Sequence, residues 1–361
     1  MSRSQDRKSS SPKTMKRYGN LYQKMLTMEN LRLAYKKSRK GKTWQVVVKE
    51  FDKDIDGNLK AIQDLLINKT FRTAEYRTRM IFEPKKREIF CLPLSPDRIV
   101  HHAIMNVLEP IWGGFFIHDS YACIAGRGIH RGSTKTMELV RTNKYCLKCD
   151  IAKFFPSIDH DILFDIIKRK IKCKDTLELL KGIIYSVPNG KNTPIGNYTS
   201  QWFGNLYMNE LDQYVKHELK INNYIRYCDD FLLFSDDKKE LNEASAKIKE
   251  FITNRLKLRL SKCSLFPVSH GVDFLGYRHF RKYILLRKST TKRVKGRMKI
   301  LPILLKKGKI SVEHFRSSVA STMGWFKWAN SHNLSLKLQL DELVNLCHTN
   351  DSTSSQKSLS L

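Results

Sequence analysis

The sequence predicts an α+β fold, because strand-like and helix-like segments follow one another without an internal repeat. Residues 224–234 form two apolar runs around Asp229 and Asp230, which is the pattern of a β-hairpin. Residues 96–110 place apolar side chains at helical spacing, and residues 290–345 are mainly helical in character. With 361 residues, 41% of them hydrophobic, the chain can bury a core and is long enough for two or three subdomains.

The first half should begin with helices and continue into a hairpin. Two short apolar runs flank a basic, Pro-containing turn at residues 84–87, which predicts strands with cations at their tip. The helix that follows should start near Ser95. In chain order we expect a helix over roughly 20–40, an irregular segment over 44–54, a helix near 57–68, a hairpin within 76–94 and a helix over 96–110.

The second half should contain the central strands. Residues 144–155 alternate like a strand that ends in a turn, and Gly196 precedes a long helical pattern. The expected order is a strand within 144–155, a helix from near Ser157 or Asp159, a helix over 199–219, the hairpin over 224–234, a charged helix over 237–256, short strands within 258–285 and helices over 290–345.

The positive charge is concentrated in two stretches. The chain has 66 Lys and Arg against 35 Asp and Glu, a formal net charge of +31. Residues 1–50 hold a net +11, and residues 278–310 hold +13 with no acid. Localised basic charge interleaved with core-type residues predicts nucleic-acid binding. Ser-rich residues 1–17 and 349–361 fit solvated, disordered tails instead.

Targeting and cysteine signals are weak. The first twenty residues lack an apolar signal region, and the longest apolar runs, such as 300–305, are too short to cross a bilayer, so we expect an intracellular protein without a membrane segment.

The eight cysteines are dispersed, which favours reduced thiols. Cys146 and Cys149 form one C-x-x-C without a second ligand pair, so two core thiols in a strand are favoured over zinc.

Three carboxylates suggest the chemistry. Asp229 and Asp230 lie between strand-forming residues, and like charges there repel unless a cation or solvent relieves them. An exposed turn is the simpler interpretation of that pair alone. Asp150, at the end of another predicted strand, could supply a third oxygen ligand for Mg²⁺. Two such ions, about 4 Å apart, activate an attacking 3′-hydroxyl and stabilise a leaving pyrophosphate.

These residues resemble the motifs of reverse transcriptases, in the same order from about residue 20 to 345. Tyr227-Cys228-Asp229-Asp230 is similar to the Y-x-D-D box. The other matching stretches are Asp150–Phe155 (first catalytic carboxylate), Phe274–Tyr277 (primer grip), Pro194–Gln201 (the Gln-Gly-x-x-x-Ser-Pro box), and Arg98–His102 with Asp119–His130 (fingers motifs of group II intron-like enzymes).

Ile195 and Gln201 point to one subgroup. The reverse transcriptases of diversity-generating retroelements have Ile-Gly-x-x-x-Ser-Gln where most relatives have Gln-Gly-x-x-x-Ser-Pro. Group II intron proteins usually continue into a maturase, DNA-binding or endonuclease region, which is not evident here. Retron enzymes tend to show Asn-Ala-x-x-His and Val-Thr-Gly, and neither string occurs. Another group II intron-like reverse transcriptase, intron-derived or in phage defence, and an inactive RNA-binding scaffold remain the alternatives.

The resemblance implies a right-hand polymerase with fingers, palm and thumb. The division would be a basic tail at 1–17, an N-terminal extension and fingers at 18–145 interleaved with the palm, a palm at 146–285, a helical thumb at 286–348 and a tail at 349–361. The implied enzyme is a cytoplasmic, bacterial or phage-encoded RNA-directed DNA polymerase. It would copy a template-repeat RNA from dNTPs, with errors at template adenines, to diversify a gene. An accessory variability protein, a small basic helical oligomer, is the implied partner.

The resemblance also assigns site residues. Asp150, Asp229 and Asp230 would bind two Mg²⁺ ions, with help from the Ile151 carbonyl, and Lys262 is either a general acid for pyrophosphate or a surface lysine. The implied nucleotide contacts are Lys85 and Arg87 on the triphosphate unless they form only an exposed basic turn, Phe155 under the sugar, and Ile195, Gly196 and Gln201 near the base pair. The implied nucleic-acid contacts are Arg98, Arg127, Tyr227, Gly276, Tyr277, Arg287, Lys288, Lys292 and Arg293.

Ile195 gives the sharpest hypothesis. It places a branched apolar side chain where most relatives have an amide that can hydrogen-bond near the nucleotide and template. Losing a polar contact narrows the free-energy gap between right and wrong nucleotides, and each 1.4 kcal/mol or so is about tenfold in discrimination. The aromatic residues Trp325, Phe326 and Trp328 are expected to pack the thumb.

Overall fold

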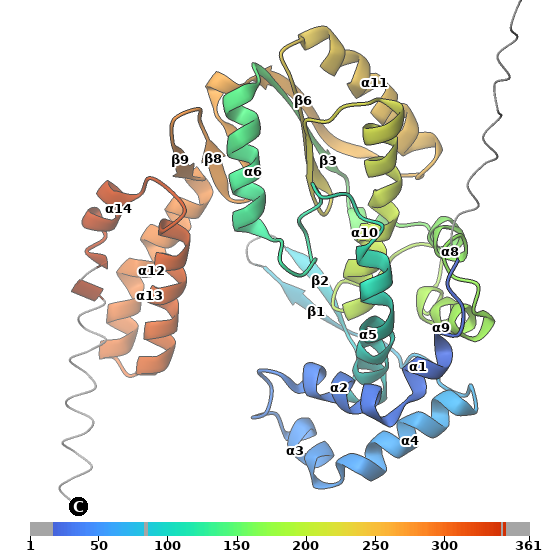
Figure 1. The fold of residues 1–361 in the computed structure, drawn as a ribbon. Coiled ribbons are helices and arrows are strands. Elements are labelled where there is room, and N and C mark those ends of the chain that lie inside the picture. Colours follow the sequence, from blue (N-terminus) through green and yellow to red (C-terminus); the bar gives the residue numbers. More distant parts are fainter. Residues whose placement is uncertain (1–16, 83–85, 341, 344–361) are drawn as a thin grey trace, which may run out of the picture. The chain divides into compact units, whose positions relative to one another are not determined.

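The structure, a computed structural model, describes residues 17–82, 86–340 and 342–343 (Figure 1). The chain forms two compact units, each built from three segments. The first comprises Met1–His118, Ile151–Lys220 and Lys247–Ser261, and the second comprises Asp119–Asp150, Ile221–Ala246 and Lys262–Leu361. None of the helices in the described ranges has the length and apolar character needed to span a bilayer. Helices and antiparallel strand pairs occur together, as an α+β fold requires.

The first unit begins with four helices, α1 (Tyr22–Leu26), α2 (Met28–Arg39), α3 (Val46–Lys53) and α4 (Ile55–Ile67). The single helix predicted over 20–40 is wrong: Thr27 is extended, and its side chain accepts a hydrogen bond from the Asn30 amide to cap α2. The irregular segment predicted over 44–54 is also wrong. Val48 and Phe51, three residues apart, are both buried and fold this stretch as α3.

Strands β1 (Arg77–Ile81) and β2 (Arg87–Cys91) form the predicted hairpin. They pair antiparallel from Arg77 opposite Cys91 to Ile81 opposite Arg87. Residues 83–85, which include the predicted phosphate contact Lys85, lie outside the described residues. A π-helical segment over Leu94–Arg98, in which only Ser95 has non-helical φ and ψ, leads directly into α5 (Ile99–Gly113), so the predicted helix start near Ser95 is confirmed.

The rest of the first unit is helical. Its helices here are α7 (Phe154–Ser157), α8 (His160–Lys168), α9 (Lys174–Ile184) and α10 (Tyr198–Gln213), which continues as a π-helix over Tyr214–Glu218. Asp159 caps α8 by accepting from the Asp161 and Ile162 amides, which confirms the predicted helix start. Most residues of α10 are buried, so this helix forms the centre of the unit.

The central sheet has the strand order β4-β5-β3-β6. Its strands are β3 (Tyr145–Ile151), β4 (Tyr224–Tyr227), β5 (Asp230–Ser235) and β6 (Leu260–Pro267). β5 pairs antiparallel with both β3 and β4, and the β4–β5 hairpin confirms the prediction for residues 224–234. The predicted charged helix is α11 (Lys238–Asn254). Cys146 and Cys149 are buried thiols of β3, as expected for a core strand.

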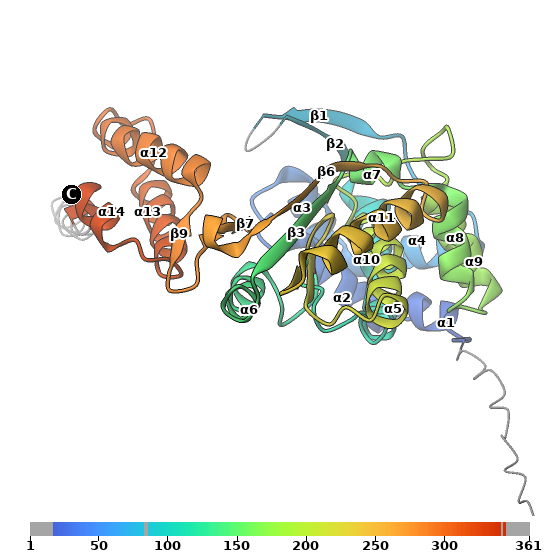
Figure 2. The same cartoon turned by 90° about the horizontal axis from the view of Figure 1, so that it is seen from above.

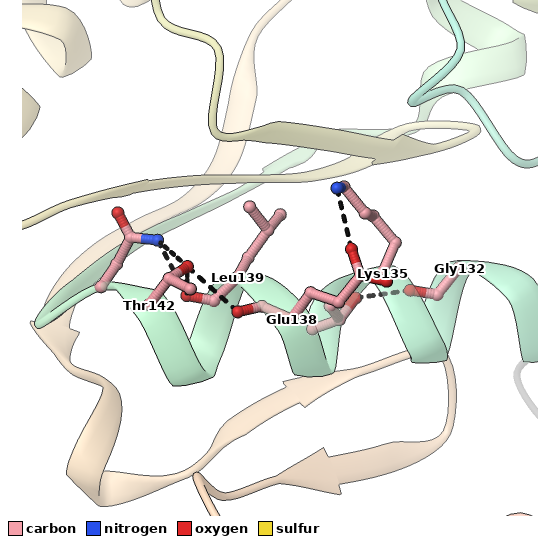
Figure 3. Close-up of polar contacts among 7 residues, drawn as sticks. Gly132, Lys135, Glu138, Leu139 and Thr142 are labelled. Atoms are coloured by element: carbon pink, nitrogen blue, oxygen red, sulfur yellow. Dashed lines mark hydrogen bonds and ion pairs between the residues drawn. The ribbon is translucent and has the colours of Figure 1, made fainter.

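Helix α6 (Ile129–Thr142) was not predicted, and its buried face explains why. The first half of that face contains Gly132, Ser133 and Thr136, small or polar residues that interrupt the apolar spacing, and only its second half is apolar, with Met137, Leu139 and Val140. Polar contacts run along the helix: Lys135 pairs with Glu138 at 2.9 Å, and the Thr142 hydroxyl donates to the Glu138 carbonyl at 3.0 Å (Figure 3). The small residues let α6 pack closely against strand β8 (Tyr277–His279).

Within the described residues, the C-terminal part of the second unit combines a small sheet with three helices. Strands β7 (Val272–Phe274), β8 and β9 (Ile284–Leu286) pair antiparallel in that order. The helices are α12 (Lys288–Lys306), α13 (Val312–Phe326) and α14 (His332–Lys337), and α12 and α13 lie side by side (Figures 1 and 2). Tyr277, Met298, Phe315 and Phe326 share one buried core there.

His279 makes folding sensitive to acid. Its Nδ1 lies 3.1 Å from the Val272 carbonyl and its Nε2 lies 2.7 Å from the Ser133 hydroxyl. Burial lowers the pKa of His279 to about 4; nearby Lys148 lowers it further and Asp273 opposes the change. In the unfolded chain a histidine titrates near pH 6.5. The unfolded state therefore binds more protons below that pH, so the free energy of unfolding falls as the pH drops from about 6.5 toward 4.

We expect the variant His279→Gln to lose less stability than the wild type when the pH is lowered. The urea midpoint of each protein, measured at pH 7.5 and pH 5.5, gives the comparison. The wild type is the reference for this comparison. Both proteins keep buried His101, whose pKa is lowered to about 3, so His101 contributes the same acid sensitivity to each of them. Equal decreases in the two midpoints would show that His279 contributes nothing to the pH dependence.

Candidate active site

The β3–β5 register brings the predicted carboxylates to one end of the central sheet. Asp150, near the end of β3, lies directly opposite Asp230, the first residue of β5. Tyr227, the last residue of β4, is the partner of Asp230 on the other side. Asp229 occupies the intervening turn after Cys228, whose φ of 58° is left-handed. Sequence reasoning had predicted that two strand ends would supply these three side chains, and the register brings Asp150 and Asp230 face to face.

A buried arginine, which sequence reasoning missed, supports that turn. Arg226 is fully buried in β4, and its guanidinium donates to the Cys228 carbonyl at 2.9 Å. Its backbone amide donates to the Asp119 carbonyl at 2.9 Å, and its carbonyl accepts from the Tyr121 amide at 2.9 Å. The segment Asp119–Tyr121, part of a motif noted in the sequence, therefore runs along β4 and holds the turn that carries Asp229.

Asp230 is placed where its charge is difficult to maintain. Burial raises the pKa of Asp230 to about 6, and the neighbouring carboxylates Asp150 and Asp229 add to that rise. The Lys148 ammonium opposes it from 3.6 Å, measured from Nζ to Asp230 Oδ2. The other oxygen, Oδ1, is buried and has no hydrogen-bond partner among the described residues. A carboxylate oxygen in this condition is one that a cation would stabilise.

The residues fit magnesium, although they do not form a complete cage by themselves. In the described ranges no three His, Cys, Asp or Glu side chains converge as a ready-made metal cluster. Mg²⁺ does not require one, because it is commonly held by one or two carboxylates, with water and substrate phosphates completing its shell. Asp150 and Asp230, which lie opposite each other, meet that requirement, and Asp230 Oδ1 has no hydrogen-bond partner among the described residues. Asp229 is the third candidate ligand.

Two other residues predicted for this site lie on neighbouring strands. Lys262 is exposed on β6, the strand beside β3, and its proposed proton-donating role stays a prediction. Ile151 is buried at the end of β3. The Cys149 thiol lies 3.3 Å from that of Cys263 on β6, and this contact together with burial raises the pKa of Cys149.

The first unit holds the residues predicted for the nucleotide. The Ile195 carbonyl accepts a hydrogen bond from the Phe90 amide of β2 at 2.7 Å, which ties the segment before α10 to the β1–β2 hairpin. Gly196 follows with a φ of +128°, and a Cβ there would lie 2.1 Å from the Phe90 carbonyl oxygen. The close approach that requires glycine is therefore to the hairpin backbone, a contact that sequence reasoning did not foresee.

The remaining first-unit residues differ in exposure. Phe155 is half-buried in α7, and its ring packs against Gly204 of α10, where a Cβ would lie 3.2 Å from the ring. Ile195 and Arg98 are half-buried, whereas Gln201 and Arg87 are exposed. The motif that contains Arg98 reaches α10 through His102, whose ring stacks on Tyr198 at 4.3 Å.

The residues of the second unit that are predicted to contact nucleic acid differ in their exposure and in their contacts. Lys288, Lys292 and Arg293 are exposed on α12, and Tyr227 is half-buried. The Arg127 guanidinium donates to the Ser120 carbonyl at 2.7 Å. Gly276 lies under Trp325, and a Cβ there would be 2.8 Å from the indole. Arg287 pairs with Asp273 at 2.5 Å.

Tyr277 does not have the exposure that a duplex contact would need. Its side chain is 0% exposed, and its ring lies 5.2 Å from that of Trp325. The motif resemblance placed Tyr277 beside nucleic acid, but its apolar ring packs the core between β8 and α13 instead. Trp325 and Phe326 pack the same core, as expected, and Trp328 stacks on His130 at 4.5 Å.

Comparison with known proteins identifies the family. A model of the family described as reverse transcriptase (RNA-dependent DNA polymerase) matches residues 82–279, more than half of the chain. Among curated proteins, the chain is 27% identical over 258 residues to Protein YkfC of Escherichia coli K12, covering 56% of this chain and 67% of that protein. It is 23% identical over 287 residues to the group II intron-encoded protein LtrA of Lactococcus lactis subsp. cremoris, covering 60% and 47%.

A third relative is the retron Ec73 reverse transcriptase of Escherichia coli, 26% identical over 196 residues and covering 50% of this chain and 60% of that protein. The chain thus spans about two thirds of YkfC and about half of LtrA. The matched region contains Asp150, Asp229 and Asp230. The chain belongs to the reverse transcriptase family, whose class of enzyme is the RNA-directed DNA polymerase.

Proposed function

We propose that this reverse transcriptase makes error-prone cDNA from a template-repeat RNA, with mutations concentrated at template adenines, and so serves a diversity-generating retroelement. The observation that carries the proposal is the segment Ile195–Gln201, in which isoleucine and glutamine replace the glutamine and proline of most relatives. The β2 hydrogen bond to Ile195 and the glycine that follows hold this segment in a defined conformation. An altered side chain there is therefore presented in a fixed position.

Nucleotidyl transfer would use the carboxylates at the end of the central sheet. Asp150, Asp229 and Asp230 would hold two Mg²⁺ ions, which when bound lower the pKa of the primer 3′-hydroxyl and neutralise the leaving pyrophosphate. The carboxylates themselves orient the reacting groups and balance the metal charge. Lys262 would donate a proton to the pyrophosphate, and the Ile151 carbonyl would assist at the metal. Arg87 and Lys85 would bind the triphosphate of the incoming dNTP, and Phe155 would exclude a 2′-hydroxyl by bulk.

The two units would supply the parts of a right-hand polymerase. Hairpin β1–β2 corresponds to fingers, the central sheet to a palm and α12–α14 to a thumb, with the boundaries predicted from sequence. The exposed cations Lys288, Lys292 and Arg293 on α12 support binding of an RNA/cDNA duplex, because phosphate neutralisation dominates such affinity. An accessory variability protein would be the protein partner.

Replacing Ile195 with Gln should lower misincorporation opposite template adenine by about tenfold or more, because a restored polar contact worth about 1.4 kcal/mol widens the gap between right and wrong nucleotides. Misincorporation opposite each of the four template bases, measured in single-nucleotide primer extension, tests this. The matched control is Ile67→Gln, at a half-exposed isoleucine in α4 of the same unit. The role of Ile195 would be contradicted if the wild type rarely misincorporates opposite template adenine, or if Ile195→Gln leaves that misincorporation frequency unchanged.

The second candidate function is intron mobility or another retroelement role. The matched relatives include a group II intron-encoded protein and a retron reverse transcriptase, so intron mobility or another retroelement role is supported by similarity. The genomic neighbourhood separates the candidates: a template and variable repeat pair beside an accessory gene supports diversification, and an intron or a retron RNA gene supports the alternative.

A further inference from the structure

Lys148 forms a link that the proposed chemistry does not use. It lies on β3, two residues before Asp150, and is opposite Leu232 in the β3–β5 register. Side chains two residues apart share a face of a strand, so Lys148 faces the same side as Asp150 and reaches Asp230 diagonally across the pair. Its side chain is 21% exposed, and Nζ is 3.6 Å from Asp230 Oδ2.

The lysine is held from the opposite side by the β7–β8 hairpin. Its ammonium donates to the Asp273 carbonyl and lies 6.0 Å from the centre of the Phe274 ring. The Asp273 carboxylate in turn pairs with Arg287 at 2.5 Å, and the Arg287 amide donates to the Gly276 carbonyl at 3.0 Å. A continuous series of polar contacts therefore runs from Asp230 to the residue that precedes α12.

The distances decide how Lys148 acts on Asp230. At 3.6 Å the contact is a charge interaction rather than a full hydrogen bond, because the distance exceeds the range of such bonds. One of the three ammonium hydrogens is donated to the Asp273 carbonyl. The ammonium attracts one oxygen of Asp230, Oδ2, and leaves the buried Oδ1 without a partner among the described residues. It also offsets the repulsion between Asp230, Asp150 and Asp229. Lys148 thus keeps one carboxylate oxygen available and in a fixed direction.

We propose that Lys148 is a positioning residue for the metal site: anchored by Asp273, it fixes the Asp230 carboxylate so that Oδ1 can ligate a divalent cation. The inference rests on the proposed role of the three aspartates in metal binding. Groups that orient a metal ligand typically change metal affinity or activity by about 10–100-fold when removed. The contact with Asp273 also makes the metal site depend on the position of the hairpin that leads into α12.

The test measures metal binding without nucleic acid or catalysis. Free Mn²⁺ is quantified by electron paramagnetic resonance during titration of the wild type, Lys148→Met, Lys148→Arg and a matched control, Lys144→Met. Lys144 is an exposed lysine immediately before β3, so its loss removes the same charge from the residue next to that strand. We expect Lys148→Met to weaken Mn²⁺ binding about tenfold, with Lys148→Arg closer to the wild type and Lys144→Met unchanged.

Primer extension provides the second readout. In Lys148→Met the Mg²⁺ concentration for half-maximal rate should rise about tenfold, while the rate recovers at saturating Mg²⁺. Unchanged or tighter Mn²⁺ binding in Lys148→Met would overturn the proposal, since it would mean that the ammonium only repels the metal. If Lys148→Met does not fold, as judged by circular dichroism, the comparison of Lys148→Arg and Lys148→Gln gives the same decision.

Failure of this inference is distinguishable from failure of the proposed function. Asp229→Asn reports on the carboxylates directly. If Asp229→Asn loses Mn²⁺ binding while Lys148→Met retains it, the metal site stands and the positioning role does not. If neither variant affects Mn²⁺ binding, the carboxylates are not the metal site.

Discussion

Asp229→Asn is expected to reduce primer extension on an RNA template by about a thousandfold or more. The substitution preserves shape but removes one negative charge from the group formed with Asp150 and Asp230. Metal ions supply several kcal/mol of transition-state stabilisation, and about 4 kcal/mol corresponds to about a thousandfold in rate. Single-turnover extension of a DNA primer with dNTPs and Mg²⁺ measures the effect.

The matched control is Asp165→Asn, at an exposed carboxylate of α8 that pairs only locally with Lys168 three residues later. This variant should extend primers like the wild type, because exposed ion pairs contribute little. Comparable activity in Asp229→Asn and the wild type would contradict the catalytic assignment and favour an RNA-binding scaffold. Equal melting temperatures for the three proteins would show that a lost activity is not lost folding.

Gly196→Ala is expected to destabilise the protein by about 3 kcal/mol and to disrupt activity as well. A methyl group at this position would lie 2.1 Å from the Phe90 carbonyl oxygen, and the backbone φ of +128° is unfavourable for alanine. Strain of this kind and overpacking each cost about 1–3 kcal/mol. Relief of the clash would separate the segment before α10 from β2 and break the hydrogen bond to Ile195. Urea unfolding and misincorporation assays measure the two consequences.

Comparing Gly190→Ala with Gly196→Ala separates the cost of an unfavourable φ from the cost of the steric clash with Phe90. Gly190 also has a positive φ, +67°, but no described heavy atom lies within 4 Å of a Cβ built there. Its substitution should therefore cost only the backbone term, about 1 kcal/mol, and leave nucleotide selection unchanged. Equal destabilisation by the two variants would mean that the approach to Phe90 is not a constraint, and the role of this glycine would reduce to its φ angle.

Local patterns predicted much of the fold. The hairpin over 224–234 has an apolar run on each side of one turn, so its strands could be found without tertiary information. The helix capped by Asp159 could be found for the same reason, since its capping residue and apolar face are adjacent in sequence. Asp150 could be proposed as a third ligand because it ends another predicted strand, but its register opposite Asp230 depends on strand pairing that the sequence does not specify.

Other elements depend on contacts that the sequence does not display. Helix α3 contains three consecutive valines, which favour strands locally, and only the burial of Val48 and Phe51 stabilises it as a helix. Helix α6 buries the small or polar residues Gly132, Ser133 and Thr136 in its first half, so only the second half of its inner face is apolar. In both cases tertiary packing overrides the local signal.

Lys148 and Arg226 show the same limit at the candidate site. In the sequence, both are ordinary cations within strands. Their significance arises from partners at a distance: Lys148 meets the Asp273 carbonyl 125 residues later, and Arg226 exchanges backbone hydrogen bonds with Asp119 and Tyr121. Tyr277 shows the opposite case, because a motif predicted an exposed contact where the fold buries a ring.

The alternation of the chain between its two units has a consequence for synthesis on the ribosome. The path changes unit five times, and one change falls at the peptide bond between Asp150 and Ile151. Asp150 emerges about eighty residues before Asp230, so β3 cannot acquire β5 as a neighbour until the intervening segment of the other unit has been made. Long-range pairing of this kind is slow to form. A nascent chain that ends before β5 therefore holds Asp150 without its facing partner, and no single cut can release either unit as a continuous fragment.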